Sequence, residues 1–125
     1  MTNQKLQLGT ATILEPDIAE IVVDHGIILD IDMVYEYHDW ITANMPDPCF
    51  VLINKKNAFE YTFDAQIEIG TIKQIKAVAF FTPSDTAYHV TEMLAQLPRK
   101  LDWIYKVFYT HDEALYWLKK QRKYC

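Results

Sequence analysis

The chain has 125 residues, of which half are hydrophobic and 14% aromatic, and 17 acidic residues outnumber 12 basic ones. This length fits a single domain over residues 1–125, and the composition excludes a disordered or fibrous protein. A formal charge of −5 opposes the phosphate backbone of nucleic acids, and no apolar run approaches the roughly 20 residues that cross a bilayer, so we expect neither a nucleic-acid partner nor a membrane span.

The first elements along the chain are predicted to be an antiparallel hairpin and a helix. Residues 8–14 and 18–23 are β-prone runs, and the proline of the segment between them, 15–17, presets a turn. Apolar residues at helical spacing then predict a helix over 31–45, with Asp30 placed to cap its first turn.

Strands and helices alternate along the rest of the chain. Short, wholly apolar runs are typical of strands buried on both faces, and threonine or serine residues mark the helix starts that follow. We predict strands at 50–53, 77–81 and 102–109, and helices at 63–73, 85 to about 97, and 111–122. The inward faces of the first two of these helices should carry Phe63, Ile67, Ile69 and Ile72, and Ala87, Val90, Leu94 and Leu97. The clearest local signal is the capping box formed by Thr110 and Glu113.

This order of elements predicts an α/β fold. Alternation of strands and helices indicates a mainly parallel sheet with right-handed crossovers. We therefore expect a single mixed, mainly parallel sheet of five strands, antiparallel only at the first hairpin, with four helices divided equally between its faces. Gly70 lies inside the predicted helix 63–73, where we expect it to allow close packing on the sheet.

The segments that follow the strands are the first places to look for a binding site. Ligands of open parallel sheets usually lie at the carboxyl ends of the strands, where loops and helix N-termini converge. Lys55 and Lys56 make the loop after 50–53 a candidate anion or partner site, although they could equally be two solvated lysines. The candidate residues at the strand ends are Asn54, Lys55, Lys56, Asn57, Thr62, Asp64, Ser84 and His111.

Catalytic and metal-binding patterns are not assembled in this sequence. The three glycines are too far apart for a phosphate-binding loop, and His38 lies on an apolar helix stripe, which favours a hydrogen-bonded core residue over a metal ligand. Cys49 enters a buried strand, where burial should raise its pKa and blunt its reactivity. We therefore expect no enzyme, no cofactor and no metal; an enzyme would need distant groups such as His111 and Asp85 to converge.

Cysteine usage and the aromatic residues complete the expectations. Two cysteines without paired spacing, and an N-terminus without the pattern of a secretion signal, favour the cytoplasm. We expect the aromatic residues to pack in the core or to contact a partner, because an apolar pocket would require one helix to be separated from the sheet. The residues concerned are Tyr35, Tyr37, Trp40, Trp103, Tyr105 and Tyr109.

The order of these elements, with VLINKKNAFEYTFDA at its centre, resembles that of the small bacterial SpoIIAA-like proteins of the STAS class, the anti-sigma-factor antagonists. The resemblance covers nearly the whole chain, including the segments HGIILDIDMV, TPSD and THDEALYWL. It implies a SpoIIAA-like topology and a phosphorylatable hydroxyl at the helix start after 50–53, which by position is Thr62. The Asp-Ser pair of that family is absent from residues 60–63, and Thr62 can equally be a helix N-cap.

Two functions follow as expectations. The first, implied by the resemblance, is a non-enzymatic protein-interaction or regulatory module whose partner contacts the loop at 54–62 and the helix beginning near 63. The partner could be a second copy of the chain, because an exposed edge strand and the aromatic residues favour a homodimer. The alternative is a binder of a small apolar, lipid-like or anionic ligand, which the aromatic content favours, as do the lipid-binding CRAL-TRIO-like domains grouped with the resembled proteins.

Overall fold

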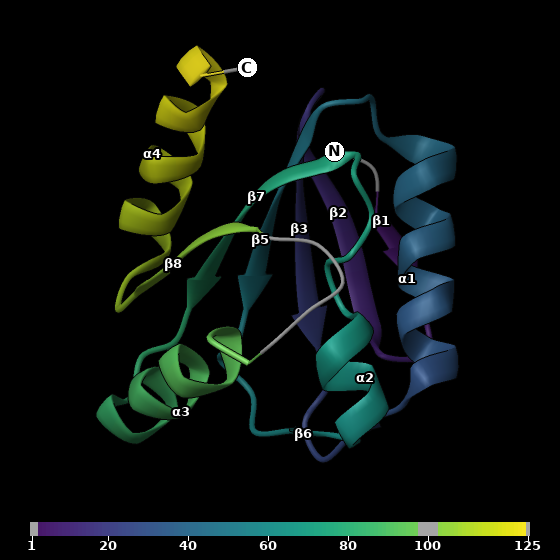
Figure 1. Cartoon of the computed structure of the whole chain (residues 1–125), viewed down its shortest axis with the longest axis vertical. Helices are drawn as coiled ribbons and strands as arrows, with labels where there is room; N and C mark the ends of the chain where they lie inside the picture. The colour runs from purple at the N-terminus through teal and green to yellow at the C-terminus, as the bar shows by residue number, and fades with distance from the viewer. Residues whose placement is uncertain (1–2, 98–102, 125) are drawn as a thin grey trace.

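A six-stranded mixed sheet forms the centre of the computed structural model, which describes residues 3–97 and 103–124. Its strands are β1 (Asn3–Lys5), β2 (Gly9–Glu15), β3 (Ile18–Val23), β5 (Cys49–Asn54), β7 (Ile75–Phe81) and β8 (Ile104–Phe108). They lie in the order β1-β2-β3-β5-β7-β8 (Figure 1). The pairs from β1 to β3 are antiparallel and the pairs from β3 to β8 are parallel, so the predicted α/β class and the predicted antiparallel hairpin are confirmed.

The prediction of five strands was wrong because it missed pairings between segments with weak local patterns. All three residues of β1 are exposed, so no buried alternation marks them as an additional strand beside β2. A separate two-stranded sheet pairs β4 (Ile28–Leu29) with β6 (Glu60–Tyr61) in parallel. Such short strands depend on a partner that is distant in sequence, and their residues alone carry little signal.

The helices are α1 (Ile31–Asn44), α2 (Phe63–Glu68), α3 (Asp85–Ala95) and α4 (His111–Gln121), and a 3-10 turn, η1 (Arg122–Tyr124), follows the last. The predicted N-caps are confirmed, since a side-chain oxygen of each accepts a hydrogen bond from an amide of the first turn. The capping residues are Asp30, Thr62, Ser84 and Thr110.

Helix α2 ends at Glu68, which is earlier than the predicted residue 73. Gly70 has a φ of +79°, a left-handed conformation that ends the helix and that other residues rarely adopt. A Cβ atom at this position would also lie 3.0 Å from two ring carbons of Trp103. Gly70 therefore packs closely against Trp103 from a position beyond the helix, and the prediction that it lies inside the helix and packs on the sheet was wrong.

The helices are divided unequally between the two faces of the sheet. Helices α1 and α2 pack on the larger core, and α3 reaches it through Tyr88. Among the described helices, only α4 covers the smaller core on the other face (Figure 1). The predicted equal division was wrong, because β2 presents Thr10 and Thr12 on that other face, and these partly exposed polar side chains need no helix to cover them.

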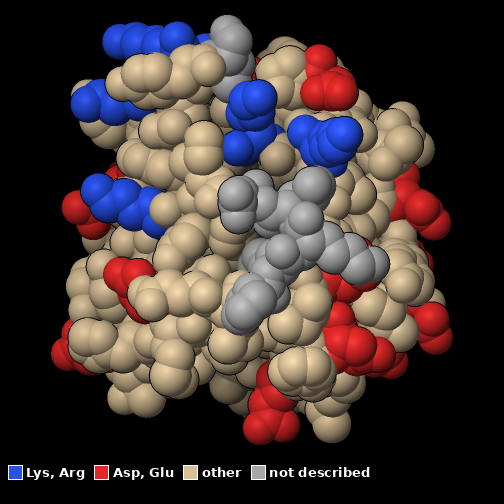
Figure 2. Space-filling model, in the orientation of Figure 1, with Lys and Arg blue, Asp and Glu red and all other residues tan. Residues whose placement is uncertain are grey.

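Charged side chains are unevenly distributed on the face that Figure 2 shows. Most basic residues lie in the upper half, toward the end where α4 lies, whereas acidic residues are spread along the side of α1, the lower edge and the opposite side. At the end of α4, Arg122 bonds both Asp17 and Glu15, and Lys119 Nζ lies 3.0 Å from a Glu15 carboxylate oxygen. These pairs join the end of α4 to the turn between β2 and β3.

Candidate functional site

Lys55 immediately follows β5 at the carboxyl edge of the parallel strands. Its side chain is only partly exposed, and its Nζ donates a 2.9 Å hydrogen bond to Thr91 Oγ1. The nitrogen also lies 5.4 Å from the ring centroids of Phe59 and Tyr61 and 5.8 Å from that of Phe80. Burial lowers the pKa of Lys55 to about 8, because the ammonium loses hydration.

Aromatic rings only partly replace this lost hydration. Cation–π contacts at such distances are each worth about 0.5 to 2 kcal/mol. Among the described residues no carboxylate forms an ion pair with Lys55, whereas Lys5, Lys119 and Arg122 all have acidic partners. Lys55 is therefore a partly buried cation whose only described polar side-chain partner is a neutral hydroxyl.

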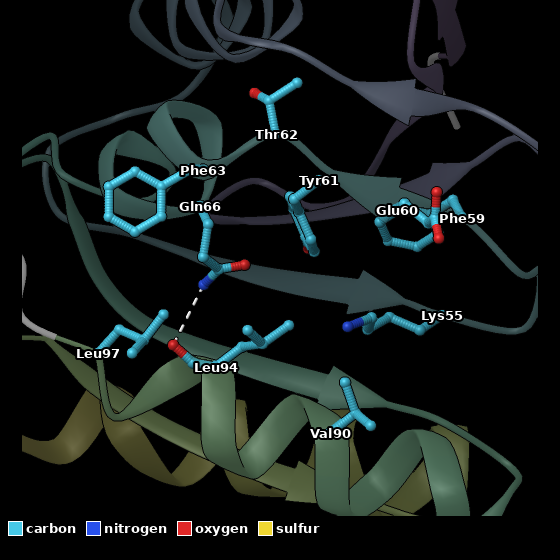
Figure 3. Close-up of a pocket in the computed structure, with 10 residues that line it drawn as sticks. All are labelled: Lys55, Phe59, Glu60, Tyr61, Thr62, Phe63, Gln66, Val90, Leu94 and Leu97. Atoms are coloured by element: carbon cyan, nitrogen blue, oxygen red, sulfur yellow. Dashed lines mark hydrogen bonds between the residues drawn. The ribbon is translucent and has the colours of Figure 1, made fainter.

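A pocket of about 410 Å³ opens beside this lysine. One wall comes from β6 and the start of α2, and the other from α3 (Figure 3). Most of the lining is apolar or aromatic, as is usual for sites that hold small molecules. The lining residues are Lys55, Phe59, Glu60, Tyr61, Thr62, Phe63, Gln66, Val90, Leu94 and Leu97. We call this the α2–α3 pocket.

The apolar stripe of α3 lines this pocket and is not part of the core. Val90 is 41% exposed, while the buried residues of α3 are Thr91 and Ala95. Leu94 and Leu97 face the pocket with Val90 (Figure 3). The prediction that this stripe faces inward was therefore wrong.

The predicted inward face of the second helix was wrong at Phe63, whereas Ile69 and Ile72, which follow α2, do pack on the larger core. Phe63 was expected to face inward, but it is 79% exposed at the pocket, and the buried residues of α2 are Ala65 and Gln66. Gln66 donates from Nε2 to the carbonyl oxygen of Leu94 at 3.2 Å. Its Oε1 is buried and has no hydrogen-bond partner among residues 3–97 and 103–124. The sequence did not predict Gln66 as a site residue, because a polar residue in a short helix gives no sign that it will be buried beside a pocket.

Thr62 contributes to the pocket wall, but its hydroxyl is engaged in the helix cap. Its Oγ1 accepts from the amide of Ala65 at 3.3 Å and donates to Asp64 Oδ1 at 2.6 Å. Asp64 also accepts from the Ala65 amide. The predicted role of Thr62 as a helix N-cap is confirmed, and its phosphorylation stays a prediction.

The remaining candidate residues separate into two groups. Asn57 and Ser84 lie near Lys55 around a groove of about 260 Å³ that adjoins the α2–α3 pocket. Asn54 and His111 instead meet at the Glu20 carboxylate, where Asn54 Nδ2 lies 3.1 Å and His111 Nε2 lies 2.8 Å from Oε2. The single predicted cluster is thus two clusters, because Asn54 and Lys55 are adjacent residues of an extended chain and point to opposite faces.

The polar residues considered for chemistry have other partners. Asp85 accepts a 2.8 Å hydrogen bond from the Tyr109 hydroxyl, whereas His111 bonds Glu20. His38 is buried, accepts from the Gly70 amide at 3.1 Å and has a pKa lowered by burial, which confirms a hydrogen-bonded core residue. Cys49 is fully buried, and burial raises its pKa to about 12, as predicted.

Comparisons with known proteins add no family to this description. No protein-family model, no curated protein and no solved structure matches the chain. Within residues 3–97 and 103–124, no helix is long and apolar enough to cross a membrane. The same residues contain no group of three or more histidine, cysteine or acidic side chains that could hold a metal ion.

Proposed function

We propose that the chain binds a small ligand with an apolar body and an anionic head in the α2–α3 pocket. The observation that carries the proposal is Lys55, a partly buried cation without a described acidic partner, beside a pocket with apolar walls. An anion at Nζ would supply the charge partner that the chain itself does not. Apolar atoms of the same ligand would cover Val90 and Leu94.

Carboxylates with a chain of moderate length are the simplest ligands of this class. Their head accepts hydrogen bonds from an ammonium, and the rest of the molecule gains from leaving water. The carboxylate of Glu60 also lines the pocket and is exposed to solvent. It disfavours a second negative charge on the ligand, so a monoanion fits better than a dianion.

Calorimetric titration with octanoate at pH 7 tests this function. The native protein should bind, and Lys55→Met should weaken binding by about tenfold, the loss of roughly one charge-assisted hydrogen bond. The matched control is Lys56→Met, since Lys56 is the exposed neighbour and does not line the pocket. Equal binding by native protein and Lys55→Met, or binding by neither, would refute the proposal. Native mass spectrometry of gently purified protein gives an independent search for a retained ligand.

A protein-interaction module with SpoIIAA-like, STAS-class topology is the second candidate. The exposed ring of Phe63 supports it, because this residue begins the helix that the resemblance places at a partner surface. Pull-down from host lysate with native protein, Phe63→Ser and Lys56→Glu would test this surface. Identical partner sets from all three proteins would count against it.

A further inference from the structure

The unpartnered amide oxygen of Gln66 restricts the chemistry of the ligand further. Gln66 is 6% exposed, and within the described part of the chain its Oε1 has no hydrogen-bond partner, although a buried acceptor usually has one. The orientation of the amide is fixed by the other end, because Nε2 donates to the carbonyl oxygen of Leu94. Exchange of the two amide atoms would place two oxygens against each other.

This oxygen lies on the same side of the pocket as the lysine. In Figure 3 the Gln66 side chain reaches between α2 and α3, and its oxygen is directed toward the side where Tyr61 and Lys55 lie. Both Lys55 and Gln66 also line a deeper cavity of about 10 Å³, closed by Phe80, Thr91 and Trp103 among others. A space of this size accepts roughly one oxygen atom.

The two polar groups make opposite demands on a ligand. Lys55 Nζ offers only donors when it is protonated, whereas Gln66 Oε1 offers only an acceptor. A carboxylate satisfies the lysine but would place a negative oxygen near the amide oxygen, which is unfavourable in a site of low dielectric constant. A hydroxyl group can accept from the lysine and donate to the glutamine at once.

We propose that the ligand of the α2–α3 pocket is a hydroxy acid, with an apolar chain, a carboxylate that pairs with Lys55 and a nearby hydroxyl that donates to Gln66 Oε1. This inference rests on the proposed function and adds a specificity to it. Sites built to hydrogen-bond a hydroxyl reject analogues that lack it, because the buried protein group is then left unpaired. Gln66 is thus the residue that distinguishes a hydroxy acid from a plain fatty acid.

The test compares ligands of one chain length on the native protein: octanoate, 2-hydroxyoctanoate and 3-hydroxyoctanoate, by calorimetry at pH 7. At least one hydroxy acid should bind about tenfold or more tightly than octanoate, as expected for one buried hydrogen bond gained. Binding of octanoate as tight as that of both hydroxy acids would overturn the hydroxy-acid inference and leave the proposed function standing. That result would also follow if water satisfied Gln66 equally well.

Gln66→Met supplies the matched variant. Methionine keeps the approximate length of the side chain, and the Leu94 carbonyl oxygen keeps its hydrogen bond from the Leu97 amide. The preference for the hydroxy acid, measured as the ratio of its dissociation constant to that of octanoate in the same variant, should disappear in Gln66→Met. A preference that survives Gln66→Met would overturn the assignment. If neither hydroxy acid nor octanoate binds the native protein, the proposed function fails with it.

Discussion

At the scale of single residues, Lys55 occupies a position that disfavours its charged form. Its pKa falls from an ordinary value of 10.5 to about 8, because burial disfavours the ammonium. A protein that placed a lysine there only for stability would do better with an apolar side chain. Side chains that lower the stability of the fold in this way are typical of binding sites, where function requires a group that stability alone would not favour.

Replacement of Lys55 by methionine should therefore stabilise the protein in a pH-dependent way. Because the folded pKa lies below the unfolded one, the unfolded chain holds more protons between about pH 8 and pH 10.5, and native stability rises with pH through that window. Lys55→Met lacks this rise. Its advantage over the native protein should be present at pH 7 and should fall by roughly 2 kcal/mol by pH 10, measured as free energies of unfolding in urea.

Lys56→Met is the control for this measurement, since Lys56 is exposed and should show the same difference from native protein at both pH values. The groups that line the pocket beside Lys55 and can themselves titrate are Glu60 and Tyr61. A stability difference between native protein and Lys55→Met that is constant from pH 7 to pH 10 would mean that the lysine is not desolvated.

At the scale of elements, the ends of α2 and the position of α3 create the pocket. Helix α2 is only six residues long and stops before the chain turns at Gly70. The turn fits against Trp103, whose indole Nε1 donates to the Ala95 carbonyl oxygen at the end of α3. Gly70 and Trp103 thus set how α2 and α3 lie relative to each other, and so the width of the pocket.

Substitution of Gly70 by alanine should destabilise the protein more than the same substitution at Gly26. Both residues have a φ of +79°, which costs an alanine about 1 to 2 kcal/mol. A Cβ at Gly26 would have no neighbour within 4 Å, whereas one at Gly70 would lie 3.0 Å from the Trp103 ring. Chemical unfolding should show an additional loss of about 1 kcal/mol for Gly70→Ala. Equal losses of unfolding free energy at the two positions would show that the Trp103 ring moves aside without a measurable loss of stability.

At the scale of the whole molecule, local sequence signals predicted the helices and most strands. The strand pairings and the packing of the helices depend on contacts between segments that are distant in sequence. Asp30, Ser84 and Thr110 act on amides within their own first turns, so their caps could be read from the sequence. The pairing of Ile28 with Glu60 joins segments far apart in the chain and leaves no such local pattern.

The candidate site, like the fold, could be predicted from the sequence only where its residues carry a local signal. Lys55 and Thr62 stand out because they follow a recognisable strand, and both line the pocket. Val90 and Leu94 carry the same helical periodicity whether they meet a core or a cavity, so the pattern could not distinguish the two. The unpartnered oxygen of Gln66 exists only in the packed structure, because it depends on which groups surround it.

The sheet face opposite the pocket depends on one helix and on an ion-pair cluster that fastens its end. Arg122 follows α4 and donates to Asp17 at 3.0 Å from Nε and 2.6 Å from Nη2, and a second acidic partner, Glu15, lies beside it. These hydrogen bonds join the segment after α4 to the first hairpin. Among the described residues, Arg122 is the only guanidinium that connects this segment to the β2–β3 turn.

A double-mutant cycle on Arg122→Leu and Asp17→Asn should measure this link. We expect a coupling of about 0.5 to 1 kcal/mol at low ionic strength, because both side chains are partly exposed and Glu15 still holds the arginine when Asp17 is changed. The coupling should fall by about half in 1 M NaCl, since exposed charges are screened. Lys120→Leu is the control cycle with Asp17→Asn, because Lys120 lies over the Tyr116 ring and forms no ion pair among the described residues. A coupling equal to that of the control, or one that salt does not change, would mean that α4 is held by its apolar face alone.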